Sequence, residues 1–250
     1  MGSNDATAPY PLRDDLVSVH EELRARIAAP GTWWSGAERT AIAAEARAAR
    51  DCPFNKERKQ ALSPTAVEGS CTSVTDLPHR VVDTIHRIVT DPGRLSRSWY
   101  EKLLADDVLT DAAYVELAAV AILQNALDVF ALAVGVTPAP LHEPLTGEPT
   151  RARPATARHD GAWVPQIPPG EDGGEDWRDV YGDRESVPQI GRALSLVPDE
   201  VRMMNLVAQP HYMKLEHVID PSYVEPGRTL DRLQTELIAA RVSAINECFY

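Results

Sequence analysis

The sequence has few aromatic residues and few stretches in which Val, Ile or Thr alternate with polar residues. Phe, Trp and Tyr together make up 6% of the 250 residues, whereas alanine is abundant in the apolar runs. Strands favour β-branched and aromatic side chains, and alanine favours helices. The composition therefore predicts an all-α fold with little or no strand. With 44% hydrophobic and 25% charged residues, the chain is typical of globular rather than disordered proteins.

The sequence also lacks an excess of basic residues and a long apolar run. Its formal net charge is -12 with a pI near 5.0, which disfavours binding to nucleic acid or anionic lipid headgroups. No uninterrupted apolar run reaches the roughly 20 residues that span a bilayer. The first residues, MGSNDATAPYP, contain no basic region followed by an apolar one. We therefore expect a soluble, cytoplasmic protein with neither a nucleic-acid nor a membrane partner.

Cysteine is scarce. The chain has three, Cys52, Cys71 and Cys248, and an odd number is not typical of the disulfide framework of a small secreted protein. Cys71 lies in a polar segment, GSCTSVTD, outside any motif. We expect it to be incidental, so any thiol chemistry is expected at Cys52 or Cys248.

Helical periodicity is clear in the first part of the chain. A first helix is predicted over 13–29, where apolar residues recur at helical spacing. The next begins at Ser35, which forms a capping box with Glu38, and it runs to Cys52. Pro53 interrupts this helix, and the segment FNKERKQAL after it is predicted to be a polar turn.

The composition of the later chain indicates two helical units joined by an arm. Further helices are predicted over 77–90, 96–106, 110–135, 187–215 and 228–250. The one over 110–135 is apolar on most faces, which is typical of a buried helix. Residues 137–187 are instead rich in Pro, Gly and charge, although Trp163, Trp177 and Tyr181 suggest that this segment packs against the protein. The predicted organisation is an N-terminal unit over 1–136, a connecting arm over 137–187 and a C-terminal unit over 188–250.

The last predicted helix carries the most specific motif. It reads ELIAARVSAINECFY from Glu236 to Tyr250, and Glu236 lies twelve residues before Cys248. This segment is similar to the core of the alkylhydroperoxidase D-like (carboxymuconolactone decarboxylase-like) family, in which a Glu lies twelve residues before a C-x-x-C pair and a His follows one turn later. The family's second cysteine would follow Tyr250, so the resemblance implies that the unit over 188–250 is cut short. One hypothesis is a selenocysteine codon read as a stop.

A second segment repeats this pattern in the N-terminal unit. In WWSGAERTAIAAEARAARDCPFNKERKQALSP, Glu38 and Glu45 precede Cys52 on a predicted helix, and Asn55 stands at the second cysteine position of a C-x-x-C motif. The chain therefore resembles a two-part relative of the alkylhydroperoxidase-related proteins, some of which carry selenocysteine. The resemblance covers about 30–135 and 188–250, and it implies an alkylhydroperoxidase D-like helical fold.

The resemblance implies a thiol-dependent peroxidase-related oxidoreductase. In a C-x-x-C pair, one thiolate attacks the peroxide and the other thiol resolves the product as a disulfide. Neither motif here contains two sulfurs, so both are degenerate. The resemblance implies Cys52 or Cys248 as nucleophile. It implies Glu236, Glu38 or Glu45 as proton relay.

The same resemblance implies the partners. They are a small-molecule substrate such as a hydroperoxide, a dithiol reductant and further copies of the chain in a homo-oligomer. Neither a cofactor nor a metal is expected, because no His spacing in the sequence matches a metal-binding motif.

Two other function classes also fit the sequence. His79 and His86 lie seven residues apart on one face of a predicted helix. With Glu45 or Glu116 they could serve a lyase, an isomerase or a decarboxylase-like enzyme that uses acid/base rather than redox chemistry. A non-catalytic, oligomerising binding protein is the third class. Peroxide-dependent cysteine oxidation would favour the first class, and a closed apolar pocket with convergent His and Glu the second.

Overall fold

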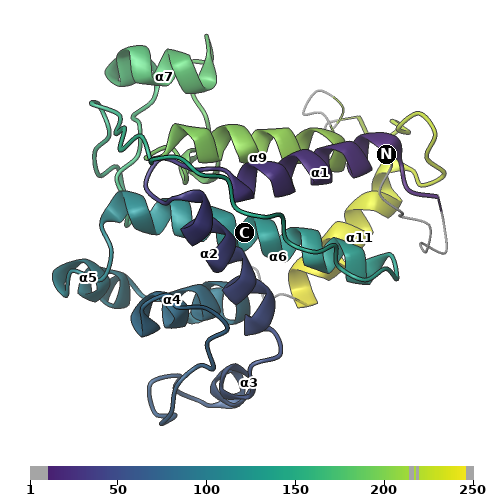
Figure 1. Ribbon diagram of the computed structural model, residues 1–250. Coiled ribbons are helices and arrows are strands. Elements are labelled where there is room, and N and C mark those ends of the chain that lie inside the picture. The colour runs from purple at the N-terminus through teal and green to yellow at the C-terminus, as the bar shows by residue number, and fades with distance from the viewer. Residues whose placement is uncertain (1–10, 214–216, 218–219, 246–250) are drawn as a thin grey trace.

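The computed structural model describes residues 11–213, 217 and 220–245, and this part of the chain is built from helices. No strand occurs in the described residues, and a single antiparallel bridge joins Arg158 to Gln166. The predicted all-α fold is therefore confirmed. Figure 1 shows the arrangement of the helices. The longer ones are α1 (Asp14–Ala28), α2 (Gly36–Ala49), α4 (His79–Thr90), α6 (Asp111–Ala133), α9 (Pro198–His211) and α11 (Arg232–Ile245). Shorter ones are α3 (Pro53–Gln60), η1 (Pro92–Arg94), α5 (Arg97–Ala105), η2 (Gly170–Gly173), α7 (Gly174–Tyr181) and α8 (Gln189–Arg192).

Local signals set the starts of several helices. The predicted capping box at α2 is confirmed, because Ser35 Oγ accepts from the Glu38 N–H while the Glu38 carboxylate accepts from the Ser35 N–H at 2.8 Å. The side chain of Thr110 caps α6 by accepting from the Ala113 N–H at 3.2 Å. These bonds satisfy N–H groups that have no partner within the helix.

The segment after Cys52 corrects one prediction. It is helix α3 rather than a polar turn. Pro53 occupies the first turn of this helix, where its missing N–H is not needed. The helix has few apolar residues, and its buried side is formed by Asn55 and Arg58. A polar buried side leaves no hydrophobic periodicity for a sequence reading to detect.

The main core lies where α2, α4 and α6 pack against one another, with α1 and α9 across one side (Figure 1). Ile42, Ile85 and Leu117 represent these three helices, and none of the three side chains is exposed. α6 is the one helix in the described residues that is long and apolar enough to cross a membrane by length and composition. More than half of its most apolar window is buried inside the protein. The core helix of a globular protein has the same properties.

A buried ion-pair triad joins α2, α6 and α9. Arg39 pairs with Glu116 and, at 2.7 Å, with Glu200, and the three side chains are almost fully buried. Glu116 also accepts from the Trp33 N–H at 2.6 Å. Burial raises the pKa of Glu200 to about 7, although Arg39 opposes this and Glu116 adds to it. Buried ion pairs therefore connect the three helices.

The connecting arm follows the surface of the helical core. Leu145 N–H donates to the Ala28 carbonyl and Arg151 N–H to the Thr32 carbonyl, both at 2.8 Å, so the arm pairs with the end of α1. Further on it forms η2 and α7. Trp177 of α7 is 2% exposed and packs in a small second core. The arm is thus packed on the protein rather than extended into solvent.

Candidate functional site

Seven polar or thiol side chains gather where α2, α3 and α4 meet, and we call them the thiol–imidazole cluster. Helix α2 contributes one carboxylate, and α4 contributes an imidazole and a second carboxylate. The first thiol belongs to the residue before α3, and α3 itself contributes an amide and a guanidinium. The loop between α3 and α4 supplies the second thiol. The members are Glu45, Cys52, Asn55, Arg58, Cys71, Asp83 and His86.

The Glu45 carboxylate is buried and fully hydrogen-bonded. Its Oε1 atom accepts from Ser73 Oγ and Thr75 Oγ1, both at 2.6 Å, and from Val74 N–H at 2.9 Å. Its Oε2 atom lies 3.1 Å from His86 Nε2. Burial alone raises the pKa of Glu45, but the hydrogen bonds outweigh it and leave this pKa below the usual value. Glu45 is therefore an anion at neutral pH.

These contacts determine the tautomer of His86. Because the carboxylate of Glu45 has no proton to donate, His86 must donate from Nε2. Burial lowers the pKa of His86, while Glu45 opposes this shift. A neutral ring that is protonated at Nε2 carries its lone pair on Nδ1. That atom lies 2.8 Å from Nδ2 of Asn55, which donates to it.

Asn55 uses its whole hydrogen-bonding capacity inside the cluster. One Nδ2 hydrogen goes to His86 Nδ1 and the other to the Ala49 carbonyl at 2.8 Å. Its Oδ1 atom accepts from Arg58 Nη2 at 2.9 Å and from Cys71 Sγ at 3.4 Å. Asn55, 2% exposed, therefore connects the imidazole, the guanidinium and one thiol.

Cys71 is a buried residue in a loop whose other residues are at least partly exposed to solvent. It is 5% exposed, and no other residue of 61–78 is buried. Its Sγ atom lies 3.8 Å from Asp83 Oδ1. Burial, with a further contribution from the Asp83 charge, raises the pKa of Cys71 to about 12. Asp83 itself is held by Arg58 at 2.6 Å and by Arg87 at 2.8 Å. Cys71 is therefore a protonated thiol at neutral pH.

The two thiols and the imidazole lie close together. Cys52 is also 5% exposed, and it is the residue before the first turn of α3. The two Sγ atoms and a ring nitrogen of His86 all lie within 4.8 Å of one another. Cys71, which the sequence led us to expect as an incidental residue, therefore lies beside Cys52. No periodicity marks this residue in the sequence, since the loop is irregular.

The other residues predicted for the site lie elsewhere. Glu38 serves the cap of α2, two turns before Glu45. Glu236 is exposed on α11 and pairs with Arg232 on the same helix, and Cys248 lies outside the described residues. Of the two histidines predicted to share a helix face, His79 is exposed at the start of α4 and only His86 is buried. The predicted candidates that the structure brings together are thus Cys52, Glu45 and His86.

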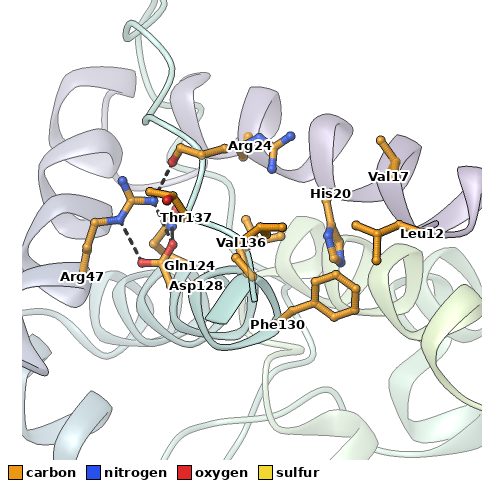
Figure 2. A pocket seen from close by; sticks show the side chains of 13 residues that line it. Leu12, Val17, His20, Arg24, Arg47, Gln124, Asp128, Phe130, Val136 and Thr137 are labelled. Carbon is orange, nitrogen blue, oxygen red and sulfur yellow. Dashed lines mark hydrogen bonds and ion pairs between the residues drawn. The ribbon is translucent and has the colours of Figure 1, made fainter. Parts of the chain in front are cut away.

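A separate small pocket lies between α1, α2 and α6 (Figure 2). Its cavity volume of about 40 Å³ has room for little more than water. Arg47 binds both oxygens of Asp128, at 2.8 and 2.9 Å, and Gln124 donates to Asp128 at 2.9 Å. At the other end His20 meets the edge of Phe130 (Figure 2). This pocket is too small for an organic substrate.

Comparison with known proteins does not assign the chain to a protein family. No family model matches it, and no curated protein or solved structure matches it significantly. The functional argument therefore depends on the residues of the thiol–imidazole cluster.

Proposed function

We propose that the chain is a thiol-dependent, peroxidase-related oxidoreductase of the alkylhydroperoxidase D-like type. Cys52 is the nucleophile in this proposal, and Cys71 replaces the second cysteine of the degenerate C-x-x-C motif. The observation that supports it is the placement of both Sγ atoms and a His86 ring nitrogen within 4.8 Å of one another.

His86 is suited to remove the proton from Cys52. Its lone pair is on Nδ1, and Glu45 accepts from Nε2 at 3.1 Å. A carboxylate in this position orients a neutral imidazole and stabilises the imidazolium that forms when the ring takes a proton. To reach the thiol, Nδ1 exchanges its bond with Asn55 for one with Cys52.

The reaction has two steps. In the first, the Cys52 thiolate attacks the terminal oxygen of a hydroperoxide, the O–O bond breaks, and the alkoxide that leaves takes the proton held by His86. This step reduces the peroxide to an alcohol and oxidises Cys52 to a sulfenic acid. In the second, Cys71 displaces hydroxide from the Cys52 sulfur, its own proton leaves with the hydroxide as water, and a disulfide forms. A dithiol reductant then returns both cysteines to thiols.

The surroundings of the two cysteines support these proposed roles. Burial, with a contribution from Asp83, keeps Cys71 protonated, which suits a resolving thiol rather than the attacking thiolate. Both sulfur-bearing residues are 5% exposed, so a small peroxide reaches Cys52 more easily than a bulky one. Hydrogen peroxide and short alkyl hydroperoxides are therefore the proposed substrates.

The acid/base alternative has less support in the same residues. Glu45 already accepts four hydrogen bonds. A carboxylate with all of its acceptor positions filled has little capacity to bind or activate a substrate. A pair of adjacent thiols also has no role in that chemistry.

The test is to treat the reduced protein with one equivalent of hydrogen peroxide or cumene hydroperoxide and to follow each cysteine by thiol labelling and mass spectrometry. We expect a Cys52–Cys71 disulfide that dithiothreitol reverses, with faster oxidation by hydrogen peroxide. Cys71→Ser should stop the reaction at the sulfenic acid of Cys52, which dimedone traps. Cys52→Ser should leave Cys71 unoxidised.

Cys248→Ser is the matched control and should oxidise like the wild type. If Cys52 and Cys71 stay reduced while the peroxide persists, the proposal is wrong. Selective oxidation of Cys248 would also overturn it and would move the nucleophile to the C-terminal motif.

A further inference from the structure

The thiol–imidazole cluster has the donor set of a transition-metal site. Two thiols and one imidazole converge in a buried position, from the start of α3, from the loop before α4 and from α4 itself. Two cysteines and one histidine form a donor set that selects zinc over calcium or magnesium, which prefer oxygen ligands. The three residues lie 19 and 15 positions apart, so only folding brings them together.

The distances between the donor atoms are close to those of a tetrahedral site. With metal–sulfur and metal–nitrogen bonds of ordinary length, two sulfur ligands lie about 3.8 Å apart, and a sulfur and a nitrogen about 3.5 Å. The three donor atoms of the cluster all lie within 4.8 Å of one another. The two sulfurs therefore need to approach by at most about 1.0 Å, and a sulfur and the nitrogen by at most about 1.3 Å, which is within reach of small side-chain rotations.

The residues around the donors support a metal-binding histidine. Because Nε2 of His86 is bound to Glu45, the atom left for a metal is Nδ1. A carboxylate that holds the remote N–H of a histidine ligand is the usual arrangement in zinc proteins, where it fixes the ring and its tautomer. Glu45 is itself held by Ser73, Thr75 and the backbone of Val74. Two thiolates would also neutralise the charge of the ion in a buried position.

We propose that the fully reduced cluster binds one Zn²⁺ ion through Cys52 Sγ, Cys71 Sγ and His86 Nδ1. The bond between Asn55 Nδ2 and His86 Nδ1 opens when the ion enters. Asn55 Oδ1 lies 3.4 Å from Cys71 Sγ, and it loses the proton donated by Cys71 when that thiol becomes a ligand. This carbonyl oxygen is therefore our candidate for the fourth ligand.

Zinc and the disulfide compete for the same two sulfurs. Bound zinc keeps Cys52 from attacking a peroxide, and oxidation of the pair releases the ion. This regulatory part rests on the proposed function, whereas the metal site itself does not. The cluster is then a zinc site whose occupancy follows its redox state.

The test is a titration of the full-length protein, reduced and free of oxygen and metal, with Co²⁺ as a spectroscopic substitute. We expect one Co²⁺ per chain, with the ligand-field bands of tetrahedral cobalt and a thiolate-to-cobalt charge-transfer band, both abolished by one equivalent of Zn²⁺. Cys52→Ser, Cys71→Ser and His86→Ala should each remove this spectrum. Glu45→Gln should weaken binding by about 10–100-fold.

His79→Ala is the matched control, because His79 is exposed on the same helix as His86, and it should bind like the wild type. Circular dichroism of each variant checks that it is folded. The absence of a tetrahedral cobalt spectrum in the reduced wild type would overturn the metal site and leave the peroxide proposal standing. Unchanged binding by the folded His86→Ala variant would overturn the donor set. A cobalt spectrum in a protein that forms no Cys52–Cys71 disulfide would support the metal site and refute the peroxidase.

Discussion

Replacing Asn55 with alanine should destabilise the protein more than any exposed substitution in the same helix. Asn55 is 2% exposed, and it makes four hydrogen bonds within the cluster. Alanine keeps the helix but removes every one of these bonds. Three buried groups then lose a partner: the Ala49 carbonyl, His86 Nδ1 and Arg58 Nη2.

The expected loss follows from the cost of buried polar groups without a partner. Each such group costs about 1–3 kcal/mol, and the cost is larger next to a charge. Three groups at the lower limit give a loss of about 3 kcal/mol in the free energy of unfolding. The weak fourth bond, from Cys71 Sγ at 3.4 Å, adds little. A loss of this size is a large fraction of the stability of a typical domain.

Urea unfolding followed by circular dichroism measures this difference, as a shift of the midpoint at constant slope. Lys56→Ala is the matched control in the neighbouring position of α3. The Lys56 side chain is 59% exposed, and its ion pair with Asp51 is long, at 3.7 Å. We expect the control to lose less than about 0.5 kcal/mol. If Asn55→Ala unfolds within about 1 kcal/mol of Lys56→Ala, Asn55 does not hold the cluster together.

Two further predictions concern the buried triad. The pKa of Glu200 in the folded state is about 7, above the ordinary 4.5. Because the folded state binds this proton more tightly than the unfolded state does, the free energy of unfolding should fall as the pH rises from 4.5 to 7. Glu200→Gln should flatten this part of the profile of unfolding free energy against pH, and an unchanged slope would contradict the assignment. Gly31→Ala should cost about 1–3 kcal/mol, because the added Cβ overlaps the carboxylate of Glu116 and the guanidinium of Arg39. Gly93→Ala is its control, since nothing lies within 4 Å of that Cβ, and thermal unfolding should separate the two; equal midpoints would count against the triad.

The candidate site could be predicted only in part from the sequence. Glu45, Cys52 and His86 were among the predicted residues, because carboxylates and a thiol on one helix and a histidine on another are visible as residue types. Glu38 was an equal candidate, and only the structure separates the two, because Glu38 caps α2 with Ser35 whereas Glu45 holds His86. The predicted roles of Glu236 and Cys248 remain untested by this geometry.

The sequence by itself determined the helical class and most helix positions, because capping boxes and apolar periodicity depend on residues only three or four positions apart. The start of α2 at Ser35 and of α6 at Thr110 are examples. The tertiary structure decided the site, because α3 has a polar buried side and Cys71 lies in an irregular loop. Hydrogen bonds that connect residues 31 and 41 positions apart, such as those of His86 to Asn55 and to Glu45, leave no local pattern. They form only when α2, α3 and α4 pack together.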